Sequence, residues 1–405
     1  MTKLSNDRLN IKLGQLVSSL SLGLDIAENR YFGHSRRTAY ISYNIAKTMG
    51  LKEEDIIDTY YSSLVHDIGM SGQLAHYSVE EIHQKKDLIM EHCYLGSKIV
   101  KKLPLNPDVS NYLLYHHEEW NGNGPYGLKG DEIPISSQII HFADCIDISY
   151  TKRIGNIGEK IDIDEIKKFV DNHKNEMFKG EICEAFLPII ETEKFWLDLK
   201  PENLRQVLDI IEPGKNIYIG IFEIKSIAES FSMLIDSKSN FTFEHSKGVA
   251  NITRKFATYL GYDQLTIDKL EIAANLHDIG KLVVPSDILE KPAQLSKAEF
   301  EIIKSHPYYT KLILNQVEGI EEIAERAGKH HEKLNGKGYP EKLDYNSITI
   351  EDQIIALADI YQALTENRPY RNGMNPQKAI DIMRNMAYEG YISSNMVSDL
   401  KQLVF

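Results

Sequence analysis

Histidine and aspartate side chains recur in one fixed order in both halves of this 405-residue chain. Each half has a histidine, a His-Asp pair, another histidine, two adjacent histidines and a final aspartate. In the second half these residues are His245, His277, Asp278, His306, His330, His331 and Asp359. In the first half they are His34, His66, Asp67, His92, His116, His117 and Asp144. The interval from the first histidine to the His-Asp pair is the same in both halves, so chance does not explain the match.

These residue types predict a metal centre. Imidazoles and carboxylates together suit iron, manganese, cobalt or zinc. A carboxylate can bridge two ions, whereas an imidazole binds one. Seven ligands are too many for a single tetrahedral ion and suit two ions with open positions. Two ions about 3.5–4 Å apart form the usual clamp for in-line attack at phosphorus, where they share a hydroxide and neutralise phosphate charge. A lone His-Asp pair is more often an ordinary helix end, but the repeated set favours a metal-dependent phosphohydrolase.

The segments around these residues are repeated as well. HSRRTAYISYNIAKTMGL, from His34, is echoed by HSKGVANITRKFATYLGY, from His245, and YHHEEWNGNGPYGL is echoed by KHHEKLNGKGYPEKL. Ordered blocks of this kind indicate a duplication. The sequence predicts a first domain over 1–195, a connection over 196–220 and a second domain over 221–405.

The elements that must position the ligands read as helices. Apolar residues recur at spacings of three and four before Gly261, namely Val249, Ile252, Phe256 and Leu260. A second helix is expected to end at His277 and Asp278, with Gly280 as its stop. A long helix is expected over 221–238. Residues 216–224 alternate in polarity and are compatible with a strand or a buried extension, and 121–134 and 335–340 read as loops. The predicted fold class is all-α.

Composition limits the classes of partner. The net charge of -13 argues against a nucleic-acid polymer, because such partners select a basic face. No apolar run is long enough for a membrane span, and the N-terminus lacks a secretion signal. Cys93, Cys145 and Cys183 show no metal-ligand or redox spacing. A cytoplasmic protein without a membrane partner is therefore expected. The oligomeric state stays open, a homodimer included.

The second half resembles the HD-GYP subgroup of the HD-domain metal-dependent phosphohydrolase superfamily. The resemblance rests on HDIGK at 277–281, on His330–His331 followed by Gly338–Tyr339–Pro340, and on RPYR at 368–371. It is strong over residues 220–405 and weaker over 1–195. It implies two tandem HD-domain (HD-GYP-like) helical bundles, a centre of two or three ions, usually iron or manganese, and cyclic di-GMP phosphodiesterase activity that gives the linear dinucleotide or the mononucleotide.

The resemblance also implies roles for single residues. It assigns one ion to His245, His277, Asp278 and Asp359, and the other to Asp278, His306, His330 and His331. Asp278 and Lys281 become the catalytic residues, with Lys281 against the scissile phosphate. Arg368 and Arg371 would hold the ligand's phosphates, and Tyr339 would lie near a guanine.

The sequence departs from this pattern in two ways. The first half has Met70 in place of Lys281, Gly124–Pro125–Tyr126 in place of the GYP order, and only Arg153 opposite the RPYR run. We therefore expect a metal-binding first domain of weak or no activity and a regulatory role. Family members with three ions carry a glutamate four residues before the first histidine. Those positions hold Arg30 and Phe241, so two ions per site are expected, with Glu28 and Glu244 as the nearby residues that could add a ligand.

Three alternatives remain open. Tandem chains with a degenerate and an intact copy also occur among hydrolases of 3′,3′-cyclic GMP-AMP, which makes this mixed dinucleotide a second candidate substrate. A non-catalytic cyclic dinucleotide receptor is also compatible with the degenerate first half. A general nucleotide phosphohydrolase is opposed by the paired arginines and the GYP loop.

Overall fold

The computed structural model describes residues 9–27, 33–70, 74, 77, 79–154, 162–214, 216–238, 245–291, 293–367 and 372–405. These residues form two compact units. We call Leu20–Ile217 the first domain, and Tyr218–Phe405 with the described residues up to Ser19 the second domain. The sequence-predicted residues that fall outside the described part are Glu28, Arg30, Phe241, Glu244, Arg368, Arg371 and the side chain of Arg153.

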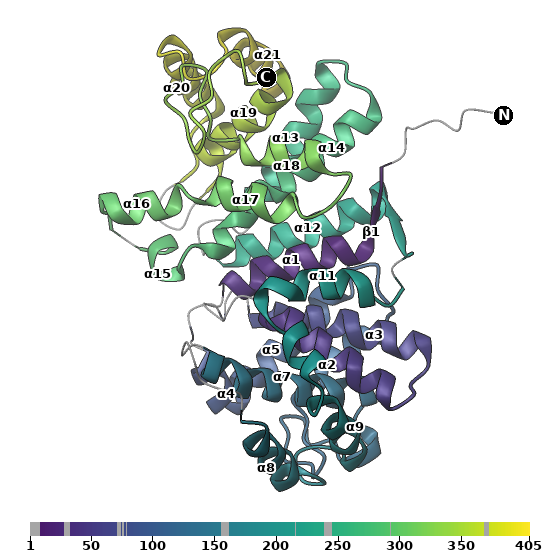
Figure 1. Cartoon of the computed structure of the whole chain (residues 1–405). Helices are drawn as coiled ribbons and strands as arrows, with labels where there is room; N and C mark the ends of the chain where they lie inside the picture. The colour runs from purple at the N-terminus through teal and green to yellow at the C-terminus, as the bar shows by residue number, and fades with distance from the viewer. Residues whose placement is uncertain are drawn as a thin grey trace, which may run out of the picture. The chain divides into compact units, whose positions relative to one another are not determined.

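The described part of the first domain consists of helices joined by loops (Figure 1). It contains the end of α1 (Leu13–Ala27). Its other elements are α2 (His34–Thr48), α3 (Glu53–Leu64), η1 (His66–Met70), α4 (Val79–Gln84), α5 (Lys86–Val100), α6 (Val109–Leu114), η3 (Gly130–Glu132), α7 (Ile135–Ile154), α8 (Ile163–His173), α9 (Gly180–Ile190), α10 (Glu193–Asp198) and α11 (Pro201–Ile211), where η marks a 3-10 helix.

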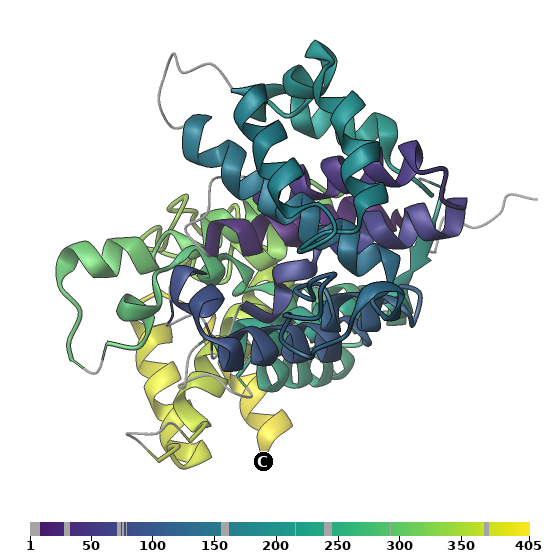
Figure 2. The same cartoon turned by 90° about the horizontal axis from the view of Figure 1, so that it is seen from below.

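The second domain adds one short pair of strands to a helical bundle, and the view at right angles again shows mostly helices (Figure 2). Its elements are β1 (Asn10–Lys12), the start of α1, β2 (Tyr218–Gly220), α12 (Ile221–Ser237), α13 (His245–Tyr259), α14 (Gln264–Leu276), η4 (Ile279–Val283), α15 (Ser286–Leu289), α16 (Lys297–Ile303), α17 (His306–Leu314), α18 (Glu321–Gly328), α19 (Ile350–Thr365), α20 (Pro376–Tyr388) and α21 (Ser394–Val404). Within the described residues, no helix is both long enough and apolar enough to cross a bilayer.

The two domains repeat one packing scheme. In the first, α2 packs against α3 and α7, and α5 packs against η1. In the second, α13 packs against α14 and α19, and α17 packs against η4. This confirms the predicted all-α class with two related helical bundles.

Local sequence explains the helices that carry the ligands. Val249 and Phe256 of α13 are fully buried, and burying such a side chain contributes about 1.5–3 kcal/mol. Gly261, at φ +81°, ends this segment in the left-handed conformation that favours glycine. The side chain of Asp263 then accepts a hydrogen bond from Thr266 N (3.0 Å) and caps α14.

Gly280 has a different role from the predicted one. Helix α14 ends at Leu276 and the chain continues into η4, where Gly280 does not take a positive φ. A Cβ atom at Gly280 would lie 1.9 Å from the carbonyl oxygen of His306, and one at Gly69 would lie 2.1 Å from that of His92. Glycine is needed here because the His-Asp segment packs directly on the backbone of the helix that carries the next histidine.

The domain boundaries of the structure also differ from the predicted ones. β1 pairs with β2 in antiparallel register, with Ile11 opposite Ile219, and both side chains are buried. The segment over 216–224 is therefore a short strand that leads into α12, and the described residues up to Ser19 group with the second domain. Helix α11 packs on α2, so it belongs to the first domain and not to a connection.

Candidate metal centres

Helix ends deliver most of the second-domain histidines. His245 begins α13 and His306 begins α17, while His277 follows α14. His330 and His331 follow α18, and Asp359 lies within α19. These residues are buried, apart from the half-buried His331. Residues far apart in the sequence thus converge in one interior site.

Asp278 joins two groups of ligands. His245, His277 and Asp359 form one group and His306, His330 and His331 another, with ligand atoms within 4.8 Å of one another in each. Asp278 Oδ2 lies 3.3 Å from His277 Nε2, and its Oδ1 lies 3.3 Å from His306 Nε2. One carboxylate therefore faces both groups, which is the arrangement that a bridging ligand requires.

Backbone contacts turn the imidazoles toward the centre. The Nδ1 atoms of His277, His306 and His330 donate to the carbonyl oxygens of Ala274 (2.6 Å), Ile303 (2.6 Å) and Ala327 (2.7 Å). Each Nε2 is thereby left as the ligand atom. Among the described residues, His277 Nε2 and Asp278 Oδ1 are buried without a hydrogen-bond partner. Buried polar atoms of this kind fit a metal ion, because leaving them unpaired is costly.

The electrostatics differ between the two histidine groups. Burial favours neutral imidazoles at His306, His330 and His331, whereas at His245 and His277 burial is outweighed by nearby carboxylates, which raise the pKa. Burial lowers the pKa of His306 to about 3 and that of His331 to about 4. Burial raises the pKa of Asp278, but His277 and Lys281 outweigh it and leave the value well below the ordinary one. Burial lowers the pKa of His245, yet Asp359 and Glu366 raise it to about 10, which shows that these carboxylates favour a positive charge between them. Neutral imidazole and ionised carboxylate are the forms that bind metals.

Lys281 lies directly beside the bridging aspartate. Its Nζ donates to Asp278 Oδ2 at 2.5 Å from within η4. Burial alone would lower the pKa of Lys281, but the negative charge of Asp278 raises it by more. The net shift of the pKa is upward, so the ammonium group keeps its charge. A fixed cation next to the centre is placed to meet an anionic ligand.

The GYP loop packs on the same histidines. The Tyr339 ring lies 4.9 Å from that of His331 between centroids. The buried Glu332 carboxylate accepts hydrogen bonds from the loop amides of Glu341 (2.6 Å), Lys342 (3.1 Å) and Leu343 (2.9 Å). The sequence predictions missed Glu332, although a glutamate follows the paired histidines in both halves.

A second lysine near Tyr339 was also missed. Lys304 Nζ lies 5.5 Å from the centroid of the Tyr339 ring, within cation–π range, and its side chain is 27% exposed. The aligned first-domain residue, two positions before His92, is Met90. The exchange of lysine for methionine thus occurs at two positions of the site, the other being Lys281 and Met70.

The first domain brings its predicted ligands together in the same way. His34, His66 and Asp144 form one group, and His92, His116 and His117 form another that also contains Cys93. Asp67 Oδ2 lies 3.1 Å from His66 Nε2, and Asp67 Oδ1 lies 3.4 Å from His92 Nε2. Cys93 had no metal-ligand spacing in the sequence, because its partners come from a helix and a loop that only the fold brings near.

Beside this cluster, an apolar residue occupies the position that Lys281 has in the second domain. Met70 is 2% exposed and packs with Leu74 and Ile82. Glu118 anchors the loop as Glu332 does, accepting from the amides of Tyr126 (2.5 Å) and Leu128 (2.6 Å). The Tyr126 hydroxyl, however, donates to the Met90 carbonyl (3.0 Å). The loop frame is preserved, but its aromatic residue is engaged elsewhere.

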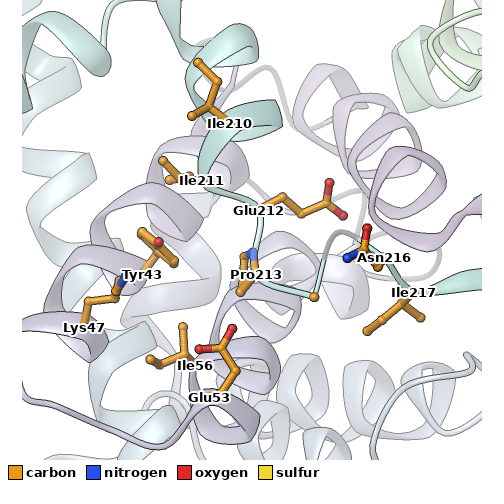
Figure 3. Close-up of a pocket in the computed structure, with 11 residues that line it drawn as sticks. Tyr43, Lys47, Glu53, Ile56, Ile210, Ile211, Glu212, Pro213, Asn216 and Ile217 are labelled. Carbon is orange, nitrogen blue, oxygen red and sulfur yellow. The ribbon is translucent and has the colours of Figure 1, made fainter.

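A separate pocket of about 520 Å³ lies in the first domain. Tyr43 and Lys47 of α2 and Glu53 and Ile56 of α3 face the end of α11 and the segment after it (Figure 3). None of its lining residues belongs to the histidine groups, so it is distinct from the candidate metal centre of this domain.

Comparison with known families matches two HD domains in this chain. One HD-domain model matches residues 31–149, and a second, also described as HD domain, matches residues 229–395. Together the matches cover more than half of the chain and include both sets of histidines.

Several characterised proteins are similar to the chain. The 3'3'-cGAMP-specific phosphodiesterase 1 of Vibrio cholerae is 28% identical over 96% of this chain and 91% of its own length. A cyclic di-GMP phosphodiesterase of Thermotoga maritima is 32% identical over 42% of this chain and 48% of its own. A crystal structure of a cyclic GMP-AMP specific phosphodiesterase from V. cholerae superposes with a TM-score of 0.69 at 25% identity, covering 98% of each chain.

Proposed function

Because this chain belongs to the HD-domain family, we propose that it is a metal-dependent phosphodiesterase of a cyclic dinucleotide and that its second domain carries the activity. The observation that supports this best is the position of Asp278, which faces two histidine groups while Lys281 contacts it. Relatives that align over nearly the full length of the chain are phosphodiesterases of this kind.

Two divalent ions, iron or manganese, would lower the pKa of a bound water and neutralise charge on the phosphate. Asp278 would serve both ions, with His245, His277 and Asp359 on one side and the remaining histidines on the other. Hydrolysis adds a hydroxyl to phosphorus and a proton to the released 3′ oxygen, which opens the ring to the linear dinucleotide. Lys281 would neutralise a non-bridging phosphate oxygen as a point charge.

Two further side chains would contact the nucleotide. Tyr339 is half-buried beside His331 and would offer a ring face to a nucleobase. The ammonium group of Lys304 lies over the Tyr339 ring. There it would add a positive charge for the second phosphate of the cyclic dinucleotide. Arg368 and Arg371 remain candidates for phosphate contacts on the basis of the motif alone.

The substrate that we propose is 3′,3′-cyclic GMP-AMP, with cyclic di-GMP as the second candidate. The sequence motifs favour cyclic di-GMP, but the relatives named for it align with only part of the chain, such as 42% for the T. maritima enzyme. Two relatives named for 3'3'-cGAMP align over 96% and 92% of the chain and include the first domain, while a third aligns over 48% of it. Because relatives that share the tandem organisation are named for 3'3'-cGAMP, we rank this dinucleotide before cyclic di-GMP, which the sequence motifs alone had favoured.

We propose that the first domain binds metal, has little or no turnover and regulates the second. Its ligands converge as those of the second domain do, but Met70 and Met90 stand where the second domain has lysines. At the position of Lys281, a phosphodiester in the first domain would meet the apolar side chain of Met70 and its neighbours.

Product analysis after anaerobic loading with ferrous iron or manganese tests the proposal. We expect cleavage of 3′,3′-cyclic GMP-AMP to a linear product, with slower cleavage of cyclic di-GMP, and a large loss of both in Lys281→Ala. Tight binding without product would instead support a receptor. Cleavage of mononucleotides or simple phosphomonoesters, with both cyclic dinucleotides left intact, would support a general phosphohydrolase.

A further inference from the structure

The first histidine of each set is held differently from its neighbours. His66, His116, His277, His306 and His330 donate from Nδ1 to a backbone carbonyl three residues earlier. His34 Nδ1 instead lies 2.7 Å from Asp147 Oδ2, and His245 Nδ1 lies 3.0 Å from Glu366 Oε2. Both domains thus place a carboxylate behind this histidine, that of the fully buried Asp147 or that of Glu366, whose side chain is 10% exposed.

The two carboxylates come from different positions of the repeat. Asp147 lies three residues after Asp144, in α7. The residue three positions after Asp359 is Gln362, and Glu366 follows one helical turn later, just after α19. Gln362 Nε2 donates to Glu366 Oε2 at 3.3 Å. The carboxylate has therefore moved by one turn, and an amide has taken its former position.

A third position changes together with these two. In the first domain Arg37 donates to Asp147 through Nε (2.5 Å) and Nη2 (3.0 Å). The aligned second-domain residue is Gly248, where a Cβ atom would lie 2.2 Å from Cδ of Gln362. A buried arginine-aspartate pair in one domain is thus replaced by a glycine and a glutamine whose side chain occupies the space.

We propose that Glu366 is the positioning residue that holds His245 for the metal centre. Gly248, Gln362 and Glu366 together replace the arginine-aspartate pair that supports the first histidine in the first domain. The inference rests on the proposed function, since it requires a metal at the second-domain centre. Donation from Nδ1 to a carboxylate fixes the tautomer and the ring orientation. It leaves Nε2 directed at Asp359 Oδ1, 3.1 Å away, as the ligand atom.

The substitution Glu366→Gln tests the role, with Mn²⁺ affinity measured by competition with a chelator. Loss of an outer partner of a ligating histidine typically costs about 10–100-fold in metal affinity, and we expect a loss in this range. Glu318→Gln, the same chemical change at an exposed site of the same domain, should leave the affinity unchanged. Asp147→Asn should weaken the first-domain site instead.

Rescue separates positioning from a general structural effect. The triple variant Gly248→Arg, Gln362→Asp, Glu366→Gln transplants the first-domain support and should recover most of the affinity. Thermal unfolding of the metal-free proteins establishes that each variant is folded.

Two results overturn the inference: wild-type Mn²⁺ affinity in Glu366→Gln, or a folded triple variant whose affinity is no better than that of the single variant. Loss and rescue of affinity in a protein that cleaves no cyclic dinucleotide would contradict the proposed function alone. A wild-type second domain without any metal affinity would contradict both.

Discussion

Beside the second-domain histidines, Lys281 contacts Asp278 and Lys304 lies over Tyr339. The aligned first-domain residues are Met70, buried among Leu74 and Ile82, and Met90. The ligand geometry is nearly the same in the two domains, since Asp67 and Asp278 each face two histidine groups. The comparison indicates that candidate metal ligands and the proposed substrate-contacting residues can diverge separately after a duplication, because different side chains carry the two roles.

The largest expected difference concerns the two bridging aspartates. Asp278→Asn removes the negative charge that both proposed ions would share, and the expected loss of several kcal/mol of transition-state stabilisation should lower kcat by about a thousandfold or more. Asp67→Asn should change the turnover of the second domain by less than about tenfold, or about 1.4 kcal/mol. Steady-state hydrolysis of 3′,3′-cyclic GMP-AMP measures both. Equal losses in the two variants would show that the first domain is part of the catalytic unit.

The next difference concerns the lysine at the bridging aspartate. Lys281→Met gives the second domain the first-domain residue and should lower kcat by about 10²–10³-fold, the usual cost of one electrostatic contact to the developing charge. The reverse change, Met70→Lys in an Asp278→Asn background, should not restore turnover, because the new ammonium group would be buried among apolar side chains. Restored turnover would mean that one lysine is all that the first domain lacks.

A smaller effect is expected at Lys304. Its side chain is partly exposed, so loss of its interaction with a phosphate is expected to cost about 1 kcal/mol. Lys304→Met should therefore raise KM about fivefold and leave kcat nearly unchanged. The matched control is Lys297→Met, an exposed lysine at the start of α16, the helix that Lys304 directly follows. A fall in kcat at constant KM would place Lys304 at the reacting phosphate instead.

The smallest effect on turnover is expected at the two loop glutamates. Glu118→Gln and Glu332→Gln each weaken charge-assisted hydrogen bonds to loop amides and should lower the free energy of unfolding by about 2 kcal/mol. Chemical denaturation measures this loss in both. Only Glu332→Gln should also raise KM, because its loop carries Tyr339, the proposed contact to the nucleobase. A KM change in Glu118→Gln would show that the first-domain loop also contributes to binding.

The sequence by itself determined the duplication, the helical class and the two sets of candidate ligands. These follow from local periodicity and from repeated spacing, which survive without knowledge of contacts. The same repeat showed where the halves differ, at Met70 and at the scrambled GYP order, and so predicted unequal roles for the two domains.

Only the tertiary structure decided how the ligands are supported. The exchange of Asp147 for Glu366, the need for glycine at Gly280, and the anchoring by Glu332 all depend on atoms brought together from distant segments. The pairing of Ile11 with Ile219 also joins distant segments. It places the described residues up to Ser19, which the sequence had assigned to the first domain, in the second domain. Spacing reveals which residue types recur, but hydrogen bonds and close packing between remote segments arise only when the folded backbone sets their distances.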